Sequence, residues 1–286
     1  MNNSLMNTLS KLVIATLGAG ILLASCKKDQ EINPDTTPTG IDTTESATAF
    51  GRLELVVIPM VGEKALRLGD EYESKNQERF ILKALSFFLS EIALNSSSGK
   101  ETTLRSDMES GIHLLDFSRP NFDAGYGQQS VLLRFQADTG RYSGLNLSLG
   151  VPRELNNSDP TVAPQPLDSA VIKGLYWGWD SGYIFMLADG EGQDIANNRF
   201  HLTFGKRQGT IGYTYGGFGP TRIRIEKDKT TRIVLSFDFN EVLTNANGSG
   251  YSLADPATAM VHGGANSLII RDNTTKAFDF ISLEMF

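Results

Sequence analysis

The segments Arg222-Ile-Arg-Ile-Glu226 and Ile233-Val-Leu-Ser-Phe-Asp-Phe239 decide the fold class of this chain of 286 residues. Apolar and polar side chains alternate most clearly here, and most of the apolar ones are β-branched or aromatic. A period of two is typical of strands, and these residue types favour them. Both segments therefore predict β-strands.

Similar short runs, separated by turn residues, extend in both directions from these segments. The candidate strands are Arg52–Pro59, Phe80–Leu94, Ile112–Phe117, Val131–Ala137, Leu145–Val151, Tyr183–Ala188, Arg199–Gly205, Thr221–Glu226, Arg232–Phe239, Ser267–Arg271 and Phe278–Phe286. Turns are expected at 96–99, 138–140, 189–190 and 247–248, where Gly, Ser, Asp and Asn gather. Many short strands of this kind indicate an all-β fold, and we predict an antiparallel β-sandwich with long loops.

One candidate strand also fits a helix. Within Phe80–Leu94, helical spacing is shown by the apolar residues Leu82, Leu85, Phe88, Leu89 and Ile92. The adjacent phenylalanines and the hairpin-like Ser/Gly cluster that follows favour a strand. No second linker interrupts residues 49–286, so we expect a single domain, in which Val151–Asp168 forms a long loop.

The N-terminal segment resembles a lipoprotein signal peptide. A single base, Lys11, precedes the apolar run Leu12–Ala24, which is shorter than the about 20 residues of a membrane span. The run ends in Leu23-Ala-Ser-Cys26, which looks like a bacterial lipobox, and the alternative is a structural helix with an incidental thiol. We predict a signal peptide over residues 1–25 and acylation (palmitate) of Cys26. We predict a flexible tether over residues 26–48, because these residues include few apolar side chains.

The junction after the predicted cleavage site resembles that of Bacteroidota lipoproteins. It reads Ser25-Cys-Lys-Lys-Asp29, with charged residues directly after the cysteine. We therefore expect an outer-membrane lipoprotein that is held at the membrane by its lipid and faces either the periplasm or the cell surface.

Composition and motifs exclude several classes of function. The net charge of −7 argues against non-specific nucleic-acid binding, and one cysteine cannot form a disulfide within the chain or a cysteine-based zinc site. The nucleophile elbow Gly-x-Ser-x-Gly, the His-Glu-x-x-His helix and a phosphate loop are all missing from the sequence. The glycine-containing stretch Gly212–Gly219 is expected to form an aromatic-rich hairpin or bulge, and we predict that the protein is not an enzyme.

Both tryptophans lie in Gly174-Leu-Tyr-Trp-Gly-Trp-Asp-Ser-Gly-Tyr-Ile-Phe185, where an extended strand would direct them the same way. Taken alone, such a pair is typical of core or rim aromatics. The sequence nevertheless resembles the MbnP family of copper-associated proteins in a series of ordered blocks. These are Phe87–Leu94, His113-Leu-Leu-Asp116, Leu149–Asn156, Tyr176-Trp-Gly-Trp-Asp-Ser-Gly-Tyr183, Ile233–Leu243 and Met260-Val-His262.

This resemblance implies a copper site. In that family a tryptophan can be oxidised to kynurenine by a di-haem partner related to cytochrome c peroxidases, and the kynurenine can join histidines in holding copper. Carried over to this chain, it implies His113, His262 and Trp177 as metal ligands, with Trp177 preferred to Trp179 for the modification. Imidazole suits copper, so the chemistry is consistent.

The resemblance leaves His201 as a structural histidine, because the family histidine is expected two positions later, at Thr203. Asp116 and Asp238 could orient a histidine, and a surface or turn role suits them equally.

A different class of function stays open from the sequence. The same fold could serve as a cell-surface module without metal that binds glycans or proteins, with Tyr126, Tyr213, Tyr215 and Phe218 stacking on sugars. Clustering of these rings, with the three histidines far apart, would favour this alternative. Close approach of His113, His262 and the tryptophan pair would favour copper.

Overall fold

The computed structural model describes residues 49–96, 98–118, 129–178, 180–205, 211–216 and 223–286, and within 211–216 it describes only the backbone. The predicted signal peptide, Cys26 and the tether lie outside the described residues, as do Trp179, Tyr126 and Phe218 and the side chains of Tyr213 and Tyr215. None of the helices in the described part of the chain is long and apolar enough to cross a membrane.

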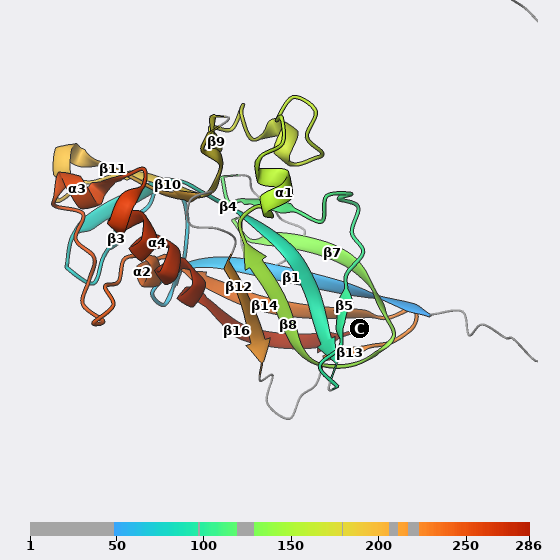
Figure 1. The fold of residues 1–286 in the computed structure, drawn as a ribbon. Helices are drawn as coiled ribbons and strands as arrows, with labels where there is room; N and C mark the ends of the chain where they lie inside the picture. Colours follow the sequence, from blue (N-terminus) through green and yellow to red (C-terminus); the bar gives the residue numbers. More distant parts are fainter. Residues whose placement is uncertain (1–48, 97, 119–128, 179, 206–210, 217–222) are drawn as a thin grey trace, which may run out of the picture. The chain divides into compact units, whose positions relative to one another are not determined.

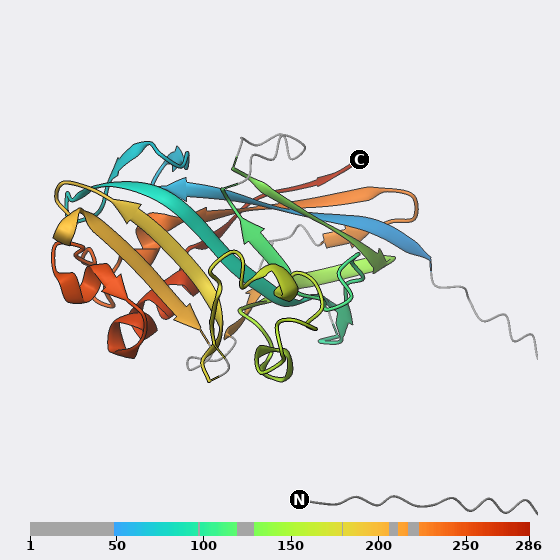
Figure 2. The same cartoon turned by 90° about the horizontal axis from the view of Figure 1, so that it is seen from above.

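The smaller of two sheets has β1 at its centre (Figures 1 and 2). It runs in the order β16, β14, β1, and then β7 and β2 on the far side of β1; the strands are β1 (Phe50–Val61), β2 (Lys64–Ala65), β7 (Val131–Asp138), β14 (Thr230–Asp238) and β16 (Phe278–Met285). β1 pairs in parallel with β14, and the other pairs in this sheet are antiparallel. The predicted strands Arg52–Pro59 and Arg232–Phe239 thus form the middle of the sheet, although Phe239 itself begins the helix α2.

The larger sheet is organised by the long strand β4 (Arg79–Ser96). On one edge its first half pairs with β10 (Gly182–Glu191) and its second half with β8 (Gly140–Leu149). The other strands are β3 (Glu71–Glu73), β5 (Glu101–Thr103), β6 (His113–Asp116), β9 (Tyr176–Gly178), β11 (Arg199–Gly205), β12 (Ile211–Gly216), β13 (Ile223–Ile225) and β15 (Met260–Val261). β11 lies beyond β10 and pairs in parallel with β15.

Aromatic side chains fill the space between the sheets. The ring of Phe87 on β4 lies 4.8 Å from that of Phe237 on β14 and 5.6 Å from that of Phe278 on β16, measured between centroids. All three side chains are buried. Because residues alternate between the two faces of a strand, this contact fixes the odd-numbered residues Leu85, Phe87 and Leu89 as the inner face of β4.

The β-sandwich predicted from the sequence is confirmed, and most predicted strands are present. Phe80–Leu94 forms a strand rather than a helix, within β4. The turn expected at Asp189-Gly190 was wrong, because both residues lie inside β10. Gly190 is needed there because a Cβ atom on it would come within 2.2 Å of the Phe200 ring.

The strand predicted at Ser267–Arg271 was also wrong, because these residues belong to the helix α4. The helices are α1 (Arg153–Asn156), α2 (Phe239–Val242), α3 (Pro256–Ala259) and α4 (Gly264–Lys276), with 3-10 turns at Leu167–Ser169 and Ala196–Asn198. The isoleucines of α4 favoured a strand, but its buried positions Ser267, Ile270, Asn273 and Thr274 have helical spacing. Three of these four are polar, so no apolar stripe marked the helix in the sequence.

Candidate metal centre

A histidine bonded to a carboxylate lies on the outer face of the larger sheet. His201 on β11 stands directly opposite Asp189 on β10, and its Nδ1 lies 2.5 Å from the Asp189 Oδ1. Directly paired residues on neighbouring strands project to the same face, which explains the contact. The carboxylate orients the imidazole through Nδ1, so Nε2 is the ring nitrogen that is placed to bind a ligand.

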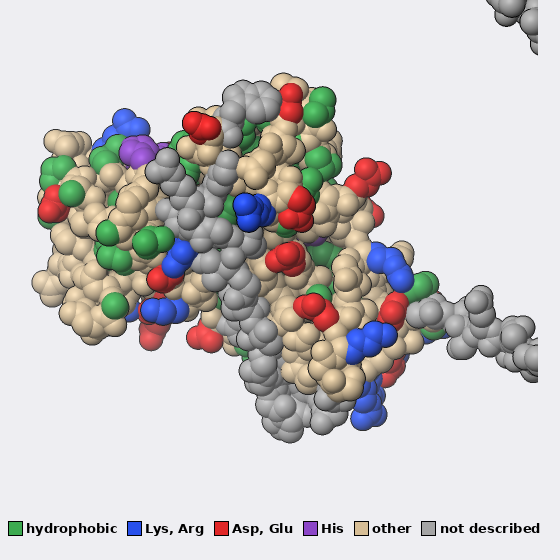
Figure 3. Space-filling model, viewed as in Figure 1, with side chains coloured by type: hydrophobic (Ala, Val, Ile, Leu, Met, Phe, Trp, Pro, Cys, Tyr) green, Lys and Arg blue, Asp and Glu red, His purple; other side chains and the backbone are tan. Residues whose placement is uncertain are grey.

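His262 completes a pair of imidazoles. β15 lies alongside β11 with Met260 opposite His201, so the chain beyond β15 carries His262 to the same place. The two ring centroids lie 4.6 Å apart, with 34° between the ring planes. Histidine side chains come to the surface over β10 and β11, as the space-filling view shows (Figure 3).

The surroundings of His262 lower its pKa. Burial lowers its pKa, and repulsion from His201 and Arg199 lowers it further, while Asp189 acts in the opposite direction. A neutral imidazole has a lone pair for a metal ion, so this shift favours ligation at neutral pH.

His113 lies on the inner face, away from this pair. It stands opposite Leu89 on β4, and its ring meets that of Phe135 on β7 at 5.1 Å between centroids. His113 and His201 are three strands apart across the sheet and five residues apart along it. At about 4.8 Å per strand and 3.3 Å per residue, roughly 20 Å separates them. The structure therefore brings His201, and not His113, to His262.

Trp177 shares the outer face with the histidine pair but lies further along β11. A Cβ atom on Gly205 would come within 2.8 Å of its ring, so the indole covers Gly205. His201, Thr203 and Gly205 alternate onto one face, and four residues of strand span about 13 Å. Thr203, which is fully buried and donates to the Val261 carbonyl at 2.7 Å, occupies the position between Trp177 and His201.

The two aspartates considered as orienting groups have other partners. Asp116 accepts hydrogen bonds from Lys173 at 2.6 Å and from Ser118, which hold its pKa down despite the opposing effect of burial. Asp238 accepts from the backbone N–H groups of Gly62 and Asn240 and caps α2. Asp189, which lies in one of the turns predicted from the sequence, takes the orienting role. Sequence reasoning missed this role because only the strand register shows that Asp189 and His201 are paired on neighbouring strands.

The pair provides two imidazole donors, and one carboxylate, Asp189, orients the ring of His201. Within the described ranges, no group of three or more His, Cys, Asp or Glu side chains is placed to hold a metal ion together. Metal ligation at the pair therefore requires a further donor of another kind, such as solvent or another side chain.

The fold and the site together define a class of protein: a two-sheet β-protein with two histidines in contact on the outer face of its larger sheet, one of them bonded to a carboxylate. The family model MbnP matches residues 50–261, which is 212 of the 286 residues. The chain belongs to the MbnP family.

Among solved structures, the chain is similar to MbnP from Methylosinus trichosporium, with a TM-score of 0.51. The two share 16% sequence identity over 76% of this chain and 82% of that chain, so the likeness concerns the fold. No curated protein sequence matches this chain.

Acid is expected to destabilise the folded protein through His113. Burial lowers the pKa of this residue from 6.5 to about 4, so between these pH values the unfolded chain binds a proton that the folded chain does not. Stability is therefore highest above pH 6.5 and falls as the pH drops toward 4, by about 3 kcal/mol from this residue.

Urea unfolding at pH 7 and pH 4 tests this expectation. The variant His113→Gln should lose about 3 kcal/mol less than the wild type over this range. Equal losses in the wild type and His113→Gln would contradict a neutral, buried imidazole.

Proposed function

We propose that this protein is a copper-binding lipoprotein of the cell envelope with no turnover of its own. The observation that carries the proposal is the contact between His201 and His262 at 4.6 Å, with Asp189 bonded to one ring. Imidazole is a good ligand for copper, and metal-bound histidines typically donate their other ring N–H to a carboxylate. Membership of the MbnP family and the resemblance of the Trp177 block support the choice of copper.

The residues present fit such a metal ion in part. His201 and His262 would hold it through ring nitrogens, and Asp189 would fix the tautomer and the orientation of His201. Bound there, copper would supply Lewis acidity or one-electron chemistry to whatever reaches the outer face. The chain's own contribution is to hold two imidazoles together before the metal arrives.

Trp177 enters the proposal as the residue for oxidation to kynurenine by a di-haem partner related to peroxidases. Its position on the same face as the histidine pair supports this role, and it is half-buried rather than enclosed in the core. The position between Trp177 and His201 is occupied by Thr203 and not by a histidine that could connect the indole to the histidine pair. We therefore propose that copper binding by the histidine pair does not depend on oxidation of Trp177.

A copper titration of the purified protein, followed by intact mass, tests the function. We expect one copper ion per chain in protein whose Trp177 is unmodified. We expect the same stoichiometry in protein whose Trp177 peptide has increased in mass through oxidation. Failure of the wild type to bind copper at low ionic strength and neutral pH would overturn the metal function. Binding that appears only in kynurenine-containing protein would overturn the independence from Trp177.

The lipid anchor is proposed from the sequence around Cys26. Small residues followed by cysteine at the end of a short apolar run suit cleavage and acylation, and several acyl chains give stable attachment to a membrane. In a bacterium with an outer membrane, we expect the wild type to label with palmitate and to fractionate with the outer membrane. Cys26→Ser should lose the label and appear in the soluble fraction, whereas Ser25→Ala should behave as the wild type.

The contact between two of the three histidines also bears on the alternative module that binds glycans or proteins. The approach of His113, His262 and the tryptophan pair that would favour copper does not occur, because His113 lies roughly 20 Å from His201 on the other face of the sheet. His201 and His262, in contrast, are in contact. We therefore propose copper binding in preference to it.

A further inference from the structure

Two exposed aromatic side chains lie at the end of the smaller sheet where the described chain begins. Phe50, the first residue of β1, is 39% exposed, and Phe286, which follows β16, is 61% exposed. Phe286 and Thr230 bond to each other through both backbone N–H groups, and Thr230 stands opposite Arg52 in the register of β14 on β1. Paired residues project to the same face, and Leu53, which alternates with Arg52, is buried in the core. Both rings therefore lie on the outer face of the sheet, at the end of the molecule where β1 starts and the C-terminus lies (Figures 1 and 2).

A cation lies over each of these rings. The guanidinium carbon of Arg105 is 4.2 Å from the ring centroid of Phe50, and that of Arg232 is 5.0 Å from the ring centroid of Phe286. Each pair presents apolar surface and positive charge side by side. Apolar side chains that are exposed together mark contact with a protein or a membrane, and the arginines favour a partner with a negatively charged surface.

The same end of the molecule carries more bases than acids. Its exposed bases lie near the ends of strands or in the turns that join them, and they are Arg52, Arg105, Arg141, Arg224, Lys227 and Lys229. The negative groups among them are Asp138, Glu226, Asp228 and the terminal carboxylate of Phe286. Positive charge is therefore in excess at this end, although the whole chain has a net charge of −7.

Two of these arginines face each other across a pair of strands. Arg141 on β8 stands directly opposite Arg224 on β13, and both side chains are exposed. Like charges directly opposite one another destabilise a sheet, so a negatively charged partner at this place would relieve the repulsion. Arg224 also lies 3.2 Å from Glu226, whereas Arg141 and Lys227 form no ion pair with any residue in the described ranges.

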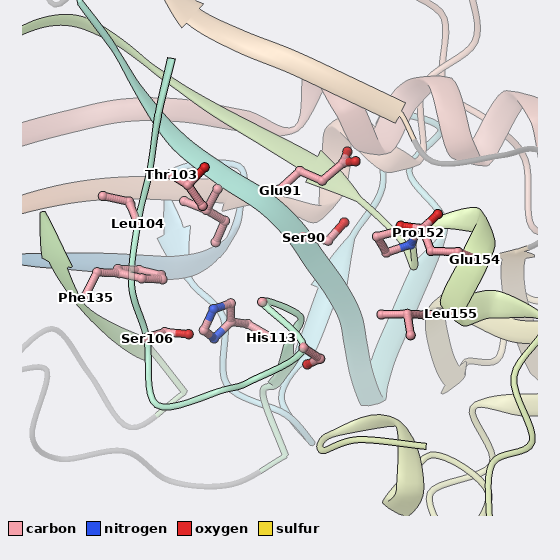
Figure 4. A pocket seen from close by; sticks show the side chains of 13 residues that line it. Ser90, Glu91, Thr103, Leu104, Ser106, His113, Phe135, Pro152, Glu154 and Leu155 are labelled. Carbon is pink, nitrogen blue, oxygen red and sulfur yellow. The ribbon is translucent and has the colours of Figure 1, made fainter. Parts of the chain in front are cut away.

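Other parts of the surface carry the opposite charge. The pocket between α1 and the chain at 103–113 is lined by Glu91 and Glu154, and none of its described lining residues is Lys or Arg (Figure 4). Charges in water are screened over about 8–10 Å at physiological ionic strength, whereas β1 alone, with 12 residues, spans about 40 Å. A surface that meets the end near Phe50 therefore senses the bases gathered there and not the acids elsewhere on the chain.

We propose that this end of the sandwich rests on the anionic headgroups of a phospholipid bilayer, with Phe50 and Phe286 entering the headgroup layer and the bases next to the phosphates. The inference rests on the lipid anchor proposed at Cys26. Residues 27–48 separate Cys26 from Ala49, so the point where the tether enters the domain stays within about 80 Å of the bilayer, at a maximum of about 3.6 Å per residue. A flexible tether of this kind gives an effective concentration in the millimolar range, so a weak contact with the bilayer suffices.

Vesicle binding of the mature chain without its lipid tests this surface. Residues 26–286 with Cys26→Ser contain every described residue and no acyl chain. They are sedimented with vesicles of phosphatidylcholine alone or of phosphatidylcholine mixed with phosphatidylglycerol. We expect binding at least about fivefold tighter to the vesicles that contain phosphatidylglycerol, and loss of this difference at high salt. Equal binding to both vesicles, or no binding to either, would overturn the proposal, whereas a failure of palmitate labelling at Cys26 would remove the anchor without changing this result.

Matched double variants locate the contact. Arg52→Gln combined with Lys227→Gln removes two exposed bases from the proposed surface and should weaken binding to the anionic vesicles about tenfold. Lys64→Gln combined with Arg67→Gln removes the same charge from exposed residues beyond the opposite end of β1 and should leave binding unchanged. Phe286→Ala should weaken binding about threefold, because the ring no longer enters the headgroup layer. Equal losses in the two double variants, or no loss in Phe286→Ala, would contradict the assignment.

Discussion

Replacing either His201 or His262 with alanine is expected to lower the affinity for copper by at least about 100-fold. Each substitution leaves one imidazole where the wild type has two rings in contact at 4.6 Å, and the remaining ring cannot hold the metal alone. Both side chains are at least partly accessible and belong to no core cluster, so the variants should fold normally. Equilibrium dialysis of folded protein against buffered copper measures the change.

Matched substitutions separate ligation from general effects. His113→Ala removes the third histidine from the inner face and should leave copper affinity unchanged. Asp189→Asn keeps the shape of the orienting residue and removes its charge, so it should weaken binding about 10- to 100-fold. Copper binding that is lost in His113→Ala but kept in His201→Ala would show that the ligands are those implied by the family resemblance and not the pair seen in the structure.

Phe87→Ala is expected to lower the free energy of unfolding by about 3–5 kcal/mol. The Phe87 side chain is fully buried at the contact between the two sheets, where its ring meets those of Phe117, Phe237 and Phe278 at 4.8 to 5.6 Å between centroids. Alanine would leave a cavity that β-strands, held by their ladders, cannot close. Urea unfolding followed by near-ultraviolet circular dichroism measures the loss.

An exposed apolar residue provides the control for this stability change. Ile172 is 91% exposed, so Ile172→Ala removes a large side chain without opening a cavity and should change the free energy of unfolding by less than about 0.5 kcal/mol. Similar small changes in both variants would mean that Phe87 does not join the two sheets.

The fold class could be predicted from the sequence because strand signals are local. The alternation in Ile233–Phe239 and the β-branched run in Arg52–Pro59 reflect burial on a sheet, and both lie in strands except for Phe239, which begins α2. Two features escaped because they depend on distant partners. The face that α4 buries is polar and bonds to remote groups, as when Ser267 donates to the Thr203 carbonyl at 2.9 Å. β1 and β14 pair in parallel although 168 residues separate Val61 from Thr230, and no local pattern specifies that pairing.

The sequence by itself determined that the chain is β-rich, identified a family resemblance along most of the domain and supplied only three histidines for any metal site. The tertiary structure decided which of them meet. His113 and His201 both lie on short strands, and their faces differ because of the registers of β6 on β4, β10 on β4 and β11 on β10. His262 reaches His201 only because β15 lies parallel to β11. The physical reason is that side-chain alternation follows from the residue order within each strand, whereas the pairing of strands is set by packing across the whole sandwich.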